Sequence, residues 1–188
     1  MFYSISKQVA SVLEKSRIVK TRLVNIKKEL TKPDSFYKGE NFENYVEDVL
    51  FPPDRYTLIR RTDTYERNRK RYSEASQDPD LLFRCKQTQN KFAVEAKYRT
   101  SLINGQLRWA KGYQLDRYKK FEKENDVPVF IAVGLQGLST RPDAVFLFPV
   151  RKINYFHLNF DIALQYKLST SSVESTHLWK LIGYNNRR

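Results

Sequence analysis

The chain has 188 residues, of which 40% are hydrophobic and 14% aromatic, a composition that excludes a disordered polymer. Its formal net charge of +13 favours a polyanionic partner such as DNA, RNA or an anionic membrane surface. No run reaches the about 18 apolar residues of a membrane span, the first residues lack the layout of a signal peptide, and the single cysteine, Cys85, excludes an intrachain disulfide, so we expect a cytoplasmic protein without a membrane anchor.

Residues 4–31 contain no glycine or proline, and their pattern predicts one long helix. Apolar residues recur at alternating spacings of four and three, interrupted once at Ser16, and the other face is rich in lysine and arginine. We therefore expect residues 1–32 to form a basic amphipathic helix that Pro33 ends. Its apolar seam either packs on the rest of the chain or pairs with a second copy, which would make a homodimer.

A second helix is predicted from Phe36 to Phe51, where Pro52-Pro53 stops it. Its expected buried stripe is Phe42, Val46, Val49 and Leu50. Glu43 borders this stripe, and it either looks toward a neighbouring site or is one more surface glutamate.

Residues 55–61 read as a strand by their β-branched and aromatic content. The polar segment 62–77 that follows contains four basic residues with Tyr65 and Tyr72 interleaved; the four are Arg67, Arg69, Lys70 and Arg71. Such a segment either grips a nucleic-acid backbone and stacks on bases or is an ordinary solvated insertion.

The residues from Asp80 to Lys97 predict a β-hairpin. Asp80 precedes the apolar run 81–85, residues 86–90 are polar and read as a turn, and residues 92–97 alternate between the two faces of a strand. If the two runs pair antiparallel, Asp80 lies beside Glu95 and Lys97. Two carboxylates at close range repel each other unless a proton or a cation intervenes, and oxygen ligands suit a hard cation such as Mg²⁺.

Further along the chain, a helix is predicted from about Arg108 to Asn125. Its inner side is expected to carry Trp109, Tyr113, Gln114, Tyr118 and Phe121. Strands are predicted at 127–133 and 144–150, with residues 134–137 turning out of the first, followed by a short edge strand at 155–158 and a helical turn at 177–182. His157 and His177 have no partners in the sequence that suggest catalysis, and too few cysteines exist for a Cys₂His₂ zinc site.

Three motifs in this order resemble those of one nuclease superfamily. Pro79-Asp80 followed by Glu95-Ala96-Lys97 resembles the PD-(D/E)XK signature. Gly39 and Glu43 are similar to the first-helix motif of Holliday-junction resolvases, in which a glycine precedes a metal-binding acid by four residues. Gln114 and Tyr118 resemble the Q-x-x-x-Y element of RecB-like members. The resemblance covers roughly half of the chain.

The resemblance implies an α/β fold of the restriction-endonuclease-like class. Residues 33–188 are then a PD-(D/E)XK nuclease-like domain, in which a mixed β-sheet with an αβββαβ core is flanked by helices, and the N-terminal helix is an addition to it. Its implied cofactor is Mg²⁺, with Mn²⁺ as a substitute. The implied ligands are the carboxylates of Asp80, Glu95 and Glu43 and the carbonyl of Ala96.

The same resemblance implies that Lys97 orients the attacking water or steadies developing charge, and that Gln114 and Tyr118 contact the substrate. Together these expectations describe a metal-dependent nuclease that hydrolyses DNA as an endonuclease, with RNA as a substrate not excluded. Two alternatives remain open at this point: a non-catalytic nucleic-acid-binding module on a nuclease-like fold, and an assembly protein that uses the N-terminal seam.

Overall fold

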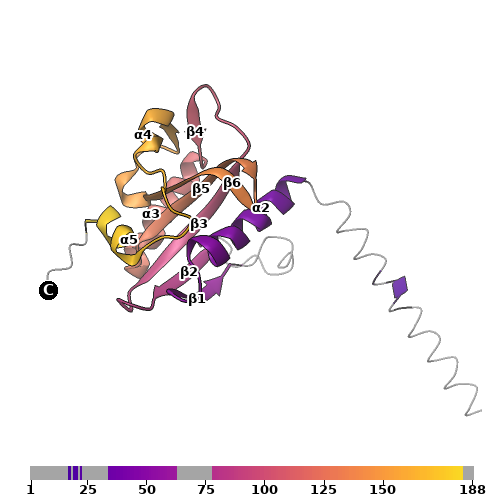
Figure 1. The fold of residues 1–188 in the computed structure, drawn as a ribbon, viewed down its shortest axis with the longest axis horizontal. Helices are drawn as coiled ribbons and strands as arrows, with labels where there is room; N and C mark the ends of the chain where they lie inside the picture. The colour runs from indigo at the N-terminus through magenta and orange to yellow at the C-terminus, as the bar shows by residue number, and fades with distance from the viewer. Residues whose placement is uncertain (1–16, 18, 21, 23–33, 63–77, 184–188) are drawn as a thin grey trace, which may run out of the picture. The chain divides into compact units, whose positions relative to one another are not determined.

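The computed structural model describes residues 17, 19, 20, 22, 34–62 and 78–183 (Figure 1). The four isolated residues have helical backbone; the rest of the predicted N-terminal helix lies outside the described residues, as does the basic segment with Arg67, Arg69, Lys70 and Arg71. The chain divides into two units, residues 1–37 and 38–188, which are described separately. Among the described residues, no helix combines the length and the apolar content needed to cross a membrane.

A five-stranded mixed sheet forms the centre of the second unit, with strand order β1-β2-β3-β5-β6 (Figure 1). Its strands are β1 Tyr56–Arg61, β2 Leu81–Cys85, β3 Lys91–Arg99, β5 Val129–Leu138 and β6 Arg141–Pro149. Neighbouring strands are antiparallel except β3 and β5, which are parallel and are connected through helix α3, Gly112–Asn125. The predicted αβββαβ core, a mixed sheet flanked by helices, is thereby confirmed.

Helices cover both faces of this sheet because its central strands are apolar on both sides. On β3, Phe92, Val94 and Ala96 belong to one core, whereas Ala93 belongs to the other. The first core is closed by α2 Asp34–Tyr45, η1 Val46–Leu50 and α5 Ser175–Leu181.

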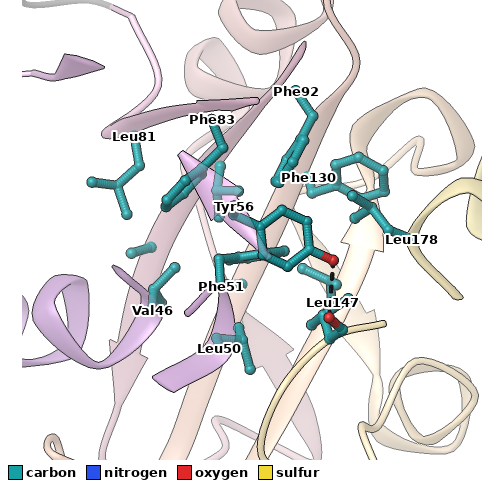
Figure 2. Packing of buried hydrophobic residues seen from close by; sticks show 14 of the residues in the cluster. Val46, Leu50, Phe51, Tyr56, Leu81, Phe83, Phe92, Phe130, Leu147 and Leu178 are labelled. Carbon is teal, nitrogen blue, oxygen red and sulfur yellow. Dashed lines mark hydrogen bonds between the residues drawn. The ribbon is translucent and has the colours of Figure 1, made fainter. Parts of the chain in front are cut away.

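Figure 2 shows the first core, where Phe51, Tyr56, Phe83 and Phe92 pack ring against ring. The buried Tyr56 hydroxyl donates to the Val173 carbonyl at 2.9 Å, so the one polar atom of this ring is satisfied. The second core lies under α3, η3 Val150–Lys152 and α4 Phe160–Leu164, with a two-stranded sheet of β4 Gln106–Arg108 and β7 His157–Asn159.

The helix boundaries differ from the predicted ones at two places. The helix predicted from Phe36 to Phe51 changes to π-helical winding at Val46, and Val49 is 38% exposed instead of buried, because the helix residues that line the core are Phe42, Val46 and Leu50, at spacings of four. The helix predicted from about Arg108 begins at Gly112. Trp109 therefore lies in the segment before the helix, where it is buried, and Tyr113 is exposed.

The predicted turn at residues 134–137 is also wrong, since β5 continues to Leu138 and the chain reverses at Ser139-Thr140. Gly134 stays in the strand because it lies against the Phe42 ring of α2: a Cβ placed on it would be 2.5 Å from a ring carbon. The β5–β6 register continues without a shift on either side of Gln136, whose φ is 57°. The absence of a side chain at Gly134 lets α2 approach β5 closely, and it does not mark a turn.

Replacing Gly134 with alanine should destabilise the fold by about 1–3 kcal/mol, because the added methyl group overpacks the contact with Phe42. The measurement is the free energy of unfolding in urea. Gly39→Ala is the matched control, since a Cβ at Gly39 in α2 meets nothing within 4 Å, and alanine favours the helix. Equal stability of Gly134→Ala and Gly39→Ala would contradict the packing described here.

Candidate active site

Asp80 lies at the start of β2, where the β2–β3 register brings it beside Glu95. Leu81 pairs with Val94, and the Asp80 Oδ2 accepts a hydrogen bond from the Ala96 backbone N–H at 2.9 Å. Thr62 fixes this corner, since its N–H donates to the Asp80 carbonyl and its hydroxyl to the Pro79 carbonyl, both at 2.8 Å. The predicted hairpin and the predicted proximity of Asp80 and Glu95 are confirmed.

Glu95 and Lys97 lie on the same face of β3 and form an ion pair between Lys97 Nζ and Glu95 Oε1. Glu95 is only 2% exposed, and its second oxygen, Oε2, has no hydrogen-bond partner among the described residues. A buried carboxylate oxygen without a donor is costly in an apolar interior. This atom is therefore poised to accept a cation or a proton.

The charge state of Lys97 follows from its neighbours. Burial alone would lower its pKa, but the Glu95 and Asp80 carboxylates outweigh burial and raise the pKa above the ordinary value. Lys97 is thus an ammonium ion at neutral pH, able to donate hydrogen bonds and to stabilise negative charge but not to accept a proton.

The raised pKa of Asp80 favours its uncharged form. Burial raises its pKa, and repulsion from Glu95 and from Glu43 raises it further, to about 8, although Lys97 and the Ala96 N–H act against this. A large part of Asp80 therefore holds a proton at neutral pH unless positive charge is added beside it. Asp80 and Glu95 together form a site with a deficit of positive charge.

Glu43 approaches this pair from helix α2, which was one of the two alternatives that the sequence left open, but its carboxylate is bound to Arg61 at the end of β1. Arg61 Nη2 lies 3.0 Å from Glu43, while Nη1 reaches Asn44 at 2.7 Å and Glu47 at 3.1 Å. Burial raises the pKa of Glu43, Arg61 and Lys97 lower it, and Glu95 raises it. Sequence reasoning missed Arg61, because its role comes from a strand and a helix meeting in space and not from any spacing.

Replacing Arg61 with glutamine should raise the pKa of Glu43 further, because the main interaction that offsets its burial is lost. The measurement is a pH titration of the Glu43 side-chain carboxyl by ¹³C NMR. Arg60→Gln is the matched control, since Arg60 pairs with Asp78 at 2.7 Å and not with Glu43. An unchanged Glu43 titration in Arg61→Gln would show that the Arg61–Glu43 pair is absent in solution.

Tyr118 of α3 completes the buried part of the site. Its side chain is fully buried, and burial, followed by the negative charge of the Glu95 carboxylate, raises the pKa of its phenol. Arg117, which sequence reasoning missed, donates from Nη2 to the Tyr118 oxygen at 3.1 Å and lies over the ring. Gln114, one turn earlier, accepts a hydrogen bond from the Lys111 N–H at 2.9 Å and so caps its own helix. Its substrate contact stays a prediction.

The chemistry of this donor set fits a hard cation in part. Asp80 and Glu95 offer carboxylate oxygens, one of which lacks a partner. The Ala96 carbonyl points to the same side of β3 as the Ala96 N–H, which faces Asp80, because both groups of a strand residue point to one side. However, no three side chains among the described Asp, Glu, His and Cys residues are arranged to hold a metal ion. Glu43 is therefore not a third ligand while Arg61 holds it.

These residues define the protein as an α/β domain with a two-carboxylate and lysine site at the end of a β-hairpin. The chain matches no protein-family model and no curated protein. Among solved structures it is similar to Hjc, a Holliday junction resolvase from the archaeal hyperthermophile Archaeoglobus fulgidus, with 17% sequence identity and a TM-score of 0.48 over 70% of this chain and 90% of Hjc. At this level of similarity, the geometry of the site has to carry any assignment of function.

Proposed function

We propose that this protein is a metal-dependent nuclease that hydrolyses DNA phosphodiester bonds as an endonuclease. One observation carries the proposal: Asp80, Glu95 and Lys97 meet at the end of the β2–β3 hairpin, with a buried Glu95 oxygen that has no partner among the described residues. A protein that only binds phosphate does not need buried carboxylates facing its anionic partner, because they repel it. Paired carboxylates need a cation, and a cation is what a phosphodiester needs for hydrolysis.

In this proposal, Asp80, Glu95 and the Ala96 carbonyl hold Mg²⁺, and Glu43 joins them when Arg61 releases it. The bound ion supplies positive charge that offsets the negative charge building up on the phosphate during hydrolysis. The protein's own contribution is to keep Asp80 and Glu95 in place, through Thr62 and the strand register, so that no reorganisation is needed when the substrate arrives.

Lys97 acts as a fixed cation beside this pair. Because its pKa is raised, it stays protonated and does not serve as the general base. Its ammonium donates hydrogen bonds to a phosphate oxygen or to the attacking water, which orients the reactants and stabilises the transition state more than the ground state.

The net charge of +13 supplies affinity for the DNA backbone that does not depend on base sequence. We propose as contacts to the DNA backbone the four basic residues that follow Thr62 by five to nine positions in the sequence, which are Arg67, Arg69, Lys70 and Arg71. Binding by such contacts weakens steeply as salt concentration rises.

The test is cleavage of supercoiled plasmid, linear duplex, single-stranded DNA and a four-way junction in Mg²⁺ or Mn²⁺ at low salt. Wild type is expected to cut at least one substrate, and Glu95→Gln is expected to bind the same DNA without cutting it. Lys120→Ala is the control, since Lys120 belongs to a solvent-exposed pair with Glu124 on α3. If no substrate is cut in either metal while wild type and Glu95→Gln bind DNA equally, the protein is a binding module and the proposal is wrong.

A further inference from the structure

Four aromatic residues lie at the start of α3 and in the segment that leads into and begins β7. Tyr155 is 66% exposed and Phe156 37%, and the His157 ring lies 6.0 Å from the first and 4.8 Å from the second. Phe156 lies beside Gly112, since a Cβ there would be 3.8 Å from its ring, and the next residue, Tyr113, is 62% exposed. We call Tyr113, Tyr155, Phe156 and His157 the aromatic patch. Scattered aromatic residues are ordinary on a protein surface, but several adjacent ones mark a contact.

Two exposed basic residues, Arg108 and Lys111, come just before Gly112 and Tyr113 in the sequence. Residues 99–115 and 144–160, which carry the patch, contain five arginines and lysines and no aspartate or glutamate; the nearest acids in sequence, Asp116, Asp143 and Asp161, lie just beyond. Arg108 pairs with His157 across the β4–β7 sheet, so its exposed side chain adjoins the rings. An apolar protein partner does not call for this charge, whereas a nucleic acid does.

Hydrogen bonds connect the aromatic patch to the strand that carries Lys97. The Trp109 N–H donates to the Phe156 carbonyl and its indole N–H to the Tyr155 carbonyl, both at 3.2 Å. Arg99, two residues after Lys97 on β3, donates to the Trp109 carbonyl at 2.9 Å. The backbone that carries Tyr155 and Phe156 is therefore bound through Trp109 to Arg99, at the end of β3 near Lys97, so this segment does not have to become ordered when DNA binds.

We infer that the aromatic patch stacks on unpaired bases, so that the substrate is DNA with a single-stranded segment, such as a flap, a gap or a branch point, next to the bond that is cut. In a continuous duplex each base is covered on both faces by its neighbours, and an exposed ring has nothing to stack on. Arg108 and Lys111 contact the phosphates of the same strand. The position of the cut rests on the proposed function, but the stacking does not.

The test is DNA binding in EDTA, which prevents cleavage, with flap DNA that carries 2-aminopurine in its single-stranded arm. Wild type is expected to quench the fluorescence of this base and to bind the flap more tightly than a continuous duplex. Tyr155→Ala should remove most of the quenching and weaken flap binding at least about fivefold, since stacking of one base contributes this much or more, and it should leave duplex binding unchanged. Tyr155→Phe, which keeps the ring, should behave like wild type.

Two results overturn the inference. One is that wild type binds flap and duplex DNA equally tightly and does not quench the fluorescence. The other is that Tyr155→Ala and Tyr155→Phe weaken the binding of both DNAs to the same extent. Cleavage in Mg²⁺ separates this inference from the proposed function. Cutting of continuous duplex that does not depend on Tyr155 contradicts the inference alone. Quenching that depends on Tyr155, without any cutting, supports the stacking and contradicts the nuclease.

Discussion

Replacing Lys97 with methionine is expected to slow DNA cleavage by about 10²- to 10³-fold, the usual cost of removing one positioned donor from a transition state. Methionine keeps the length and apolar stem of the side chain and removes only the charge. Because Lys97 repels a cation bound at Asp80 and Glu95, its loss should not weaken the apparent affinity for Mg²⁺. The measurement is the single-turnover cleavage rate as a function of Mg²⁺ concentration.

Lys120→Met is the matched control for this experiment. Lys120 also pairs with a glutamate, at 3.8 Å, but both partners are largely exposed, so removing this charge should leave the cleavage rate unchanged. Circular dichroism and a thermal melt check that Lys97→Met is folded. A folded Lys97→Met protein that cuts DNA at the wild-type rate would remove Lys97 from the mechanism.

Replacing Asp80 with asparagine should stabilise the metal-free protein at about pH 8 while it abolishes cleavage. The folded-state pKa of Asp80, about 8, is raised above its ordinary value of 3.8, so the native state binds more protons than the unfolded state between these two values. The stability from this group is complete below about pH 4 and is lost as pH rises to about 8, with a slope of at most about 1.4 kcal/mol per pH unit. Asparagine carries no charge and should remove most of this slope.

The measurement is the free energy of urea unfolding between about pH 5 and pH 8 in EDTA, for wild type and Asp80→Asn. Glu43, whose pKa is also raised, should leave a smaller slope in both proteins. Mg²⁺ added at pH 8 should stabilise wild type and have little effect on Asp80→Asn, because it binds the native carboxylates. If the free energy of unfolding changed with pH in the same way for both proteins, Asp80 would not be the group that causes the pH dependence.

The part of the site that lies on one hairpin was predictable from sequence. Asp80, Glu95 and Lys97 are fixed relative to one another by strand alternation and antiparallel register, and both follow from the apolar pattern around a short polar turn. The stripe with Phe42 and Val46 placed Glu43 at the border of the buried face of its helix, but this pattern did not decide between an inward-facing and a surface glutamate.

Contacts between elements that are distant in sequence could not be predicted. Nothing in the sequence indicates that Arg61 binds Glu43, or that Gly134 accommodates the Phe42 ring and so remains in a strand. The pattern predicts the start of α3 too early because Trp109 fits the helical spacing. In the structure, the backbone N–H groups of Trp109 and Ala110 instead donate to the Phe156 carbonyl. Tertiary packing decided each of these cases against the local pattern.

The nicking rate of flap DNA in increasing Mg²⁺, with wild type beside Glu95→Gln, tests the proposed cation-dependent nuclease most directly. We expect wild-type nicking that is absent in EDTA and saturates with Mg²⁺, and we expect Glu95→Gln to be folded, to bind the flap DNA and to nick it at least about 10²-fold more slowly. Nicking by Glu95→Gln at the wild-type rate, or nicking by wild type that persists in EDTA, would contradict a cation-dependent site built on Asp80 and Glu95.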